Sequence, residues 1–198
     1  MERRAFLAGT GRLGLVLGAA LLLPGHTPYR QWVVYRKRHL LILASKQDPE
    51  AYALCRALAE NLAAALPKSR ARPSRAGSHK RLASLLATGQ MDVAVLSPAE
   101  VRELRAGEGA GRGAGAIDLR LLLELEQGYL LVARADYPDR HAYRVAQALA
   151  GEGAQRLPVL KGGLPLHSGV EALIAGRPLP APPPEPPVPL EAADHTHR

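Results

Sequence analysis

The chain has 198 residues and is poor in cysteine, in aromatic residues and in long apolar runs. Its single cysteine, Cys55, excludes an internal disulfide, leaves the redox compartment open, and lies in an apolar helical pattern where a buried free thiol is expected. The apolar run 13–23 would rise about 16 Å as a helix, roughly half of a bilayer core, which disfavours a membrane span. With 47% hydrophobic residues, the chain suits one globular domain.

Sequence signatures of enzymes are also missing. No Gly-Lys-Ser or Gly-Lys-Thr phosphate loop occurs, and Gly109-x-Gly111-x-x-Ala114 follows a charged helical segment rather than the strand that a dinucleotide site needs. His79, Asp92 and Ser97 are the residue types of a hydrolase triad, but no Gly-x-Ser-x-Gly surrounds any serine. We therefore expect no enzymatic activity, no catalytic residue and no cofactor.

The net charge of +8 lies entirely in one segment. Residues 36–81 hold eleven Lys or Arg against three Asp or Glu, and the remaining residues balance at fifteen of each sign. Such a segment attracts anionic solutes, lipid headgroups or nucleic acid. We expect no nucleic-acid partner, because only Tyr52 offers a stacking ring there and no nucleic-acid-binding motif accompanies the charge.

The first residues have the three-part layout of a signal peptide. Arg3 and Arg4 precede the moderately apolar run 13–23, a pattern that resembles a twin-arginine signal. We expect residues 1–25 to direct export to the periplasm and residues 26–38 to form a basic linker. No small-x-small cleavage site follows the run, so an uncleaved membrane anchor stays open, as does a buried N-terminal helix.

Residues 39–176 alternate short apolar runs with amphipathic segments, and this order predicts one α/β domain in which a mostly parallel sheet is flanked by helices. The predicted strands occupy residues 40–44, 69–74, 91–96, 117–125 and 129–133, and Pro73 marks the second as an edge strand. The predicted helices are 49–66 with Asp48 as N-cap, a segment from Ser78 to Gly89, a short helix opened by Ser97-Pro98, and residues 138–149.

Two glycine- or proline-rich segments interrupt or end this pattern. Residues 107–115 carry glycine at every second position and predict a flexible loop. Ten of the seventeen prolines lie between Pro158 and Pro189, so we expect residues 177–198 to be a disordered tail. His195 and His197 in this tail are not expected to form a selective metal site.

Three stretches resemble the TAXI-type solute receptors of TRAP transporters, which are type II periplasmic binding proteins. Residues 40–66 resemble that family's opening strand, ligand loop and first helix. Residues 78–96 (SHKRLASLLATGQMDVAVL) are similar to its Ser-led helix, Leu-x-x-Gly turn and Asp-x-Ala strand. Residues 164–170 (LPLHSGV) resemble its closing Pro-Leu-His-Pro-Gly-Ala segment, in which we expect His167 to be a structural hydrogen-bonding residue.

The resemblance implies a periplasmic-binding-protein-like fold, a solute ligand and a transporter membrane subunit as partner. Such receptors have two lobes that close on the solute. Here the apolar run 129–133 is followed almost at once by the helix from residue 138, which resembles the late helix that returns to the first lobe. We therefore expect a single lobe with the second one missing.

In open α/β sheets, ligands gather at the carboxyl ends of the strands, where helix N-termini present backbone N–H groups. The ligand-binding residues expected from this rule and from the resemblance are Ser45, Lys46, Tyr52, Gly77, Ser78, His79 and Ser97. A small carboxylate or other anion is the expected solute, with Lys46 and Arg75 as charge partners. The alternative is that Ser78 and Ser97 only cap helices.

The sequence therefore favours a non-enzymatic, exported protein of the TAXI type that binds a small anionic solute for transport. The alternative is an interaction protein without a ligand, whose basic segment 36–81 docks on an anionic membrane surface or on a partner protein.

Overall fold

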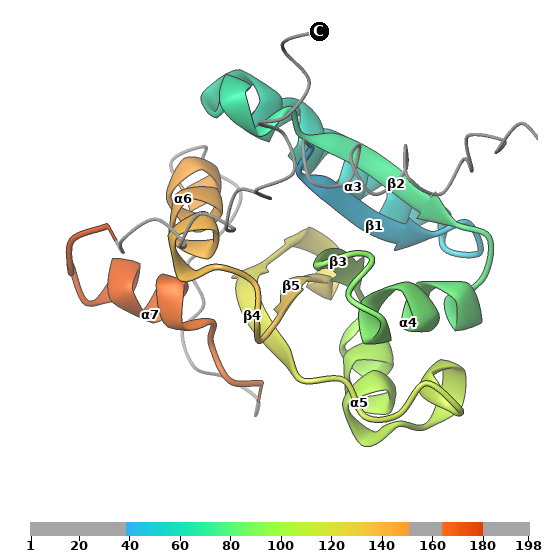
Figure 1. Ribbon diagram of the computed structural model, residues 1–198. Helices are drawn as coiled ribbons and strands as arrows, with labels where there is room; N and C mark the ends of the chain where they lie inside the picture. Colours follow the sequence, from blue (N-terminus) through green and yellow to red (C-terminus); the bar gives the residue numbers. More distant parts are fainter. Residues whose placement is uncertain (1–38, 151–163, 180–198) are drawn as a thin grey trace, which may run out of the picture. The chain divides into compact units, whose positions relative to one another are not determined.

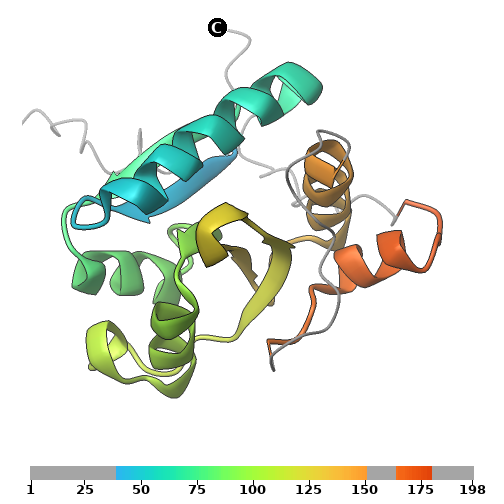
Figure 2. The same ribbon diagram turned by 180° about the vertical axis from the view of Figure 1, so that it is seen from behind.

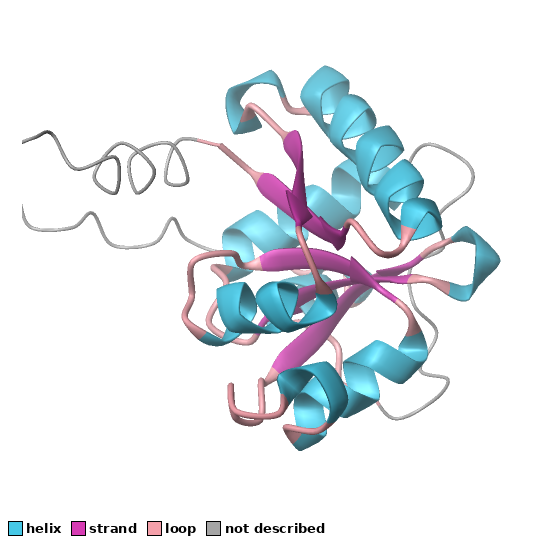
Figure 3. Ribbon diagram, turned by 90° about the vertical axis from the view of Figure 1, so that its right-hand side faces the viewer, coloured by secondary structure: helices cyan, strands magenta, loops and turns pink. Residues whose placement is uncertain are grey.

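Residues 39–150 and 164–179 are the part of the chain that the computed structural model describes (Figure 1). The predicted signal 1–25, the linker 26–38 and nearly all of the predicted tail lie outside the described residues. The described part is an α/β lobe in which one sheet has helices on both of its faces (Figure 3). This confirms the expected fold class and is compatible with a single lobe.

The sheet has five strands in the order β2-β1-β3-β5-β4. The strands are β1 (Leu41–Ser45), β2 (Arg72–Ala76), β3 (Val93–Leu96), β4 (Leu119–Glu124) and β5 (Leu130–Arg134). β1 is parallel to both β2 and β3, whereas β5 is antiparallel to its neighbours β3 and β4. The carboxyl ends of β1, β2, β3 and β4 therefore share one rim of the sheet.

Five α-helices cover the sheet: α3 (Pro49–Ala65), α4 (His79–Ala87), α5 (Pro98–Ala106), α6 (Asp139–Ala150) and α7 (Ser168–Ile174). Among the described residues, short 3-10 turns lie in three of the connections: η2 (Pro67–Ser69) between α3 and β2, η3 (Gly109–Gly111) between α5 and β4, and η4 (Glu126–Gly128) between β4 and β5. Ile42 and Ala44 of β1 pack in the same core as α3 and α6, and Leu43 packs in a second core with α4 and α5. Because both faces are covered, β1 and β3 are apolar without alternation.

The predicted helix 49–66 is confirmed, with Asp48 as N-cap and Pro49 in its first turn. Its buried stripe consists of Ala51, Cys55, Leu58, Ala59 and Leu62. Cys55 is a buried free thiol, as expected; its Sγ donates to the Ile42 carbonyl at 2.9 Å, and burial raises its pKa to about 12.

Two details of the sheet differ from the prediction. β2 spans Arg72–Ala76 instead of residues 69–74, because its parallel register sets Arg72 opposite Leu41, and Arg70 with φ of 48° turns the chain before it. Arg75 and Ala76, which lie beyond the predicted strand, therefore belong to β2. The sheet is also mixed, since the short connection between β4 and β5 can only join antiparallel neighbours.

The closing segment 164–170 lies along the outer edge of β4. The Leu121 N–H donates to the Pro165 carbonyl at 2.9 Å, and the His167 N–H donates to the Leu121 carbonyl at 3.0 Å. The buried His167 caps α7 by accepting a hydrogen bond from the Gly169 N–H, which confirms its structural role. A Cβ on Gly169 would overlap the Asp139 carbonyl, so glycine is required where α7 meets α6.

Candidate functional site

The rim at the carboxyl ends of β1, β2 and β3 brings the residues expected from the sequence together. Figure 2 shows the start of α3 and the start of α4 at this end of the sheet. Ser45 ends β1, Gly77 and Ser78 follow β2, and Ser97 follows β3. The Lys46 N–H donates to the Ala76 carbonyl at 2.8 Å, which joins the loops after β1 and β2.

His79 connects the loops after β1 and β3. Its backbone N–H donates to Gln47 Oε1 at 3.1 Å, and its Nδ1 lies 2.6 Å from Glu100 Oε1. Gln47 and Glu100 were not among the residues expected from the sequence. Six of the seven expected residues thus surround one rim, and Tyr52 lies one turn into α3.

The chain's own side chains cap the helices that begin at this rim. Asp48 Oδ1 accepts from the Ala51 N–H at 2.9 Å, and Ser78 Oγ accepts from the Arg81 N–H at 3.2 Å. Ser97 and Glu100 form a reciprocal capping box. The capping role of Ser78 and Ser97 is therefore confirmed, and few backbone N–H groups are left for an added anion.

The remaining expected residues take three different positions. Ser45 is buried, and its Oγ accepts a hydrogen bond from the Gln47 N–H at 3.1 Å, which shapes the loop. Lys46 is exposed to solvent. Tyr52 is half-buried on α3 with the Arg75 guanidinium 4.7 Å from its ring centre, so Arg75 lies over this ring.

Acidic residues and one tyrosine complete the rim, and the sequence did not identify them as site residues. The Tyr129 hydroxyl donates to Asp48 Oδ2 at 2.9 Å and lies 3.5 Å from Glu50 Oε2. Burial raises the pKa of Tyr129, and the carboxylates of Asp48, Glu50 and Glu100 raise it further. The carboxylates of Asp48 and Glu50 therefore lie beside this phenol, and that of Glu100 acts on it from a greater distance.

The topology of the sheet, rather than a local sequence pattern, brings this cluster together. Tyr129 stands 81 residues after Asp48, and no local pattern links the two. They meet because β4 runs parallel to β1 and β3, so the connection from β4 to β5 ends at the same rim. Only the strand order reveals this contact.

The electrostatic character of the rim follows from these groups. Around Tyr129, the carboxylates of Asp48, Glu50 and Glu100 create a local negative field, whereas Lys46, Arg75, Lys80 and Arg81 carry positive charge elsewhere on the rim. Such a field attracts a cationic group. Within residues 39–150 and 164–179, no group of three His, Cys, Asp or Glu side chains is arranged to hold a metal ion.

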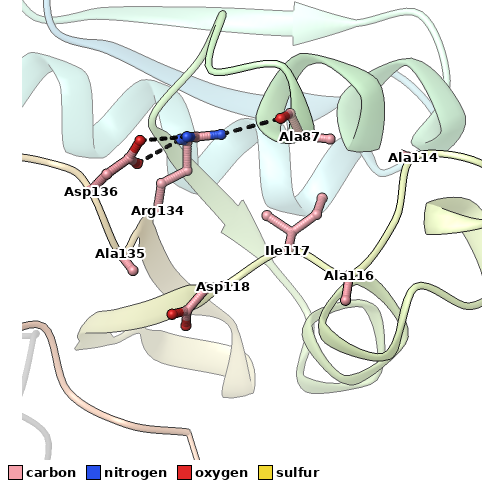
Figure 4. Close-up of a pocket in the computed structure, with 8 residues that line it drawn as sticks. All are labelled: Ala87, Ala114, Ala116, Ile117, Asp118, Arg134, Ala135 and Asp136. Carbon is pink, nitrogen blue, oxygen red and sulfur yellow. Dashed lines mark hydrogen bonds and ion pairs between the residues drawn. The ribbon is translucent and has the colours of Figure 1, made fainter.

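A hollow of about 300 Å³ lies at the end of the sheet opposite the rim (Figure 4). Arg134 forms part of its wall, with its Nε 2.8 Å from Asp136 Oδ1 and its Nη2 2.5 Å from Asp136 Oδ2. Its Nη1 donates to the Leu86 and Ala87 carbonyls at the end of α4. The hydrogen bond from Arg134 lowers the pKa of Asp136. The guanidinium is therefore engaged in joining β5 to α4, and alanine side chains line most of the remaining wall.

Comparison with known protein families and with curated proteins finds no match to this chain. Among the described helices, none combines the length and the apolar character needed to cross a bilayer. The function is therefore argued from the rim and from the sequence.

Proposed function

We propose that this chain is an exported solute-binding-like protein of the TAXI type, reduced to one lobe, that holds a small polar solute on the carboxyl rim of its sheet. The observation that carries the proposal is the cluster of Asp48, Glu50, Glu100 and Tyr129, which comes from three separate segments. The resemblance of residues 78–96 to that family's receptors supports the same rim.

The charges of the rim favour a solute with an amino group over the simple anion expected from the sequence. Glu50 is exposed, and the Asp48 carboxylate accepts from Tyr129, so an ammonium placed between them would meet two carboxylates. The carboxylate of a zwitterionic solute would then extend toward the exposed Lys46. An amino acid or a small amine therefore fits better than a dicarboxylate.

The rim is also rigid enough to bind without an opposing lobe. Capping bonds fix the starts of α3, α4 and α5, and the Tyr129 hydroxyl joins the β4–β5 connection to α3. Preorganised groups lose little conformational entropy when a solute binds. One open rim buries only one side of a small solute, so we expect weak binding.

Isothermal titration of the full chain at low salt tests this proposal. The probes are lysine as a cationic zwitterion, putrescine as a diamine and succinate as a dianion. We expect heat with lysine and putrescine and none with succinate. Glu50→Gln should weaken lysine binding several-fold, whereas Glu171→Gln, an exposed carboxylate on α7, should leave it unchanged.

Two results would contradict the proposal. Binding of succinate alone would return the site to the anion class, and no heat with any probe at millimolar concentration would remove solute binding from this rim. A Glu171→Gln effect equal to that of Glu50→Gln would show that total charge, rather than the rim, controls binding.

Export is supported by the paired arginines before the apolar run 13–23. A reporter fused after residue 40 should reach the periplasm, and changing both Arg3 and Arg4 to lysine should retain it in the cytosol. Cytosolic retention of both forms would contradict export.

A further inference from the structure

A second charged feature runs from the end of α3 along β2 to the first turn of α4, where it reaches the rim. Residues 61–91 contain no Asp or Glu. All six of their Lys and Arg side chains are exposed, and we call them the basic strip: Lys68, Arg70, Arg72, Arg75, Lys80 and Arg81.

The strip follows β2, the edge strand of the sheet (Figure 1). Arg72 and Arg75 stand on opposite faces of this strand, since their side chains alternate along it. Lys68 and Arg70 precede the strand, and Lys80 and Arg81 follow it in the first turn of α4. With about 3.3 Å per extended residue, the strip is on the order of 20 Å long.

None of the six strip side chains forms an ion pair with another residue that the structure describes. The ion pairs of Arg56, Arg120 and Arg134 lie outside the strip. Arg75 stacks on Tyr52, which leaves its charge uncompensated.

The placement of Lys80 and Arg81 is unfavourable for α4 itself. A helix dipole disfavours cations in the first turn, and α4 has no acidic residue there. A local cost of this kind points to a function outside the helix. The strip therefore indicates an external anionic partner.

The point where the chain enters the lobe favours a membrane surface as that partner. The Leu40 N–H donates to the Ser69 carbonyl and the Arg72 N–H donates to the Leu40 carbonyl, both at 2.9 Å, so the strip begins beside the start of β1. In the sequence only residues 24–40 separate β1 from the apolar run 13–23. Seventeen residues span at most about 60 Å, so an uncleaved anchor at this run would keep the strip within that distance of the bilayer.

We propose that the basic strip docks this lobe on a bilayer surface rich in anionic phospholipid. Six neighbouring cations act jointly over such a surface, since the Debye length of about 8–10 Å is comparable with their spacing. Nucleic acid fits less well, because the one aromatic ring beside the strip, that of Tyr52, is covered by Arg75. The docking uses none of the carboxylates or the tyrosine proposed to hold the solute, and it does not depend on solute binding.

Vesicle co-sedimentation of the full chain tests the proposal with two variants that each remove four positive charges. The strip variant changes Lys68, Arg72, Lys80 and Arg81 to glutamine. The control variant changes four exposed arginines elsewhere to glutamine: Arg102, Arg112, Arg144 and Arg177. Circular dichroism shows whether both variants fold.

The vesicles contain phosphatidylcholine with roughly 30% phosphatidylglycerol, and binding is measured at low salt. The strip variant should bind these vesicles at least roughly tenfold more weakly than wild type. The control variant should change by about twofold or less, and pure phosphatidylcholine should show no difference between the proteins. Changing Arg72 and Arg81 to lysine keeps the charges and should preserve vesicle binding. This variant is measured if the glutamine variant does not fold.

Equal losses in the strip and control variants would overturn the proposal, as would unchanged binding by the strip variant. Loss of affinity for a short DNA duplex without any loss on anionic vesicles would assign the strip to nucleic acid instead. Because Glu50→Gln alters only the rim, retained vesicle binding by that variant separates the docking surface from the solute site.

Discussion

Protonation of His167 should destabilise the lobe between pH 7.5 and 5.5. The imidazole is 0% exposed, and its Nδ1 accepts the Gly169 N–H at 3.2 Å. Adding a proton to Nδ1 would remove this acceptor and place a charge in the core. Burial accordingly lowers the pKa of His167 from its ordinary value of 6.5, although Asp139 Oδ1 lies only 3.7 Å away.

The sign and the size of this effect follow from the difference between the folded and unfolded states. The unfolded histidine binds its proton near pH 6.5, and the folded one does so only at lower pH, so stability is complete at high pH and falls as the pH drops through 6.5. If the folded imidazole stays neutral at pH 5.5, the loss is about 1.4 kcal/mol.

His167→Asn isolates this contribution, because asparagine is a good N-cap and does not titrate in this range. Urea unfolding followed by circular dichroism at pH 7.5, 6.5 and 5.5 gives the free energy of unfolding. Wild type should lose about 1 kcal/mol more than the variant over this range. The pKa of His141 is also lowered by burial, and its share is common to both proteins. Identical pH slopes would refute the reasoning.

Three further substitutions test the packing and the caps. Gly169→Ala should lower the free energy of unfolding by about 1–3 kcal/mol or more in a urea titration, because the added Cβ would overlap a carbonyl of α6. Gly77→Ala, which has open space around it, should lower it far less. Equal losses would contradict the close approach at Gly169. Arg134→Met should lower the melting temperature through the loss of roughly 1–3 kcal/mol of hydrogen bonding to α4 and to Asp136. Because Arg134 lowers the pKa of Asp136, this difference from wild type should shrink as the pH falls below the ordinary carboxyl value of 3.8 toward that lowered pKa. Asp48→Ala should cost about 1–2 kcal/mol because it removes both the α3 cap and the tether to Tyr129, while Tyr129→Phe removes the tether alone and should cost less in the same unfolding assay.

Local sequence signals predicted the elements that depend on neighbouring residues. Asp48 before Pro49 identified the start of α3, and Ser97 before Pro98 identified the start of α5, because capping chemistry acts within one helical turn. The apolar runs likewise located β1 and β3. The placement of β2 failed by a few residues, since its parallel register with β1 is not encoded in its own short sequence.

Only part of the candidate site could be predicted from the sequence. The loops after β1, β2 and β3 follow from the strand rule, which placed Ser45, Ser78 and Ser97 at one rim. The contact between Tyr129 and Asp48 depends on β4 running parallel to β3 with β5 between them, and no periodicity reports this order. The charge of the rim was consequently unpredicted, and with it the class of solute.

The closing segment that lies along β4 also affects how this lobe behaves among other copies of itself. Its backbone bonds to Leu121 occupy part of one margin of the sheet, and at the other margin Pro73 lacks an N–H while the flanking arginines repel an identical strand. Both edges of the sheet thus disfavour stable pairing with a strand from a neighbouring molecule. We therefore expect the sheets of neighbouring lobes not to join into fibrils at high protein concentration.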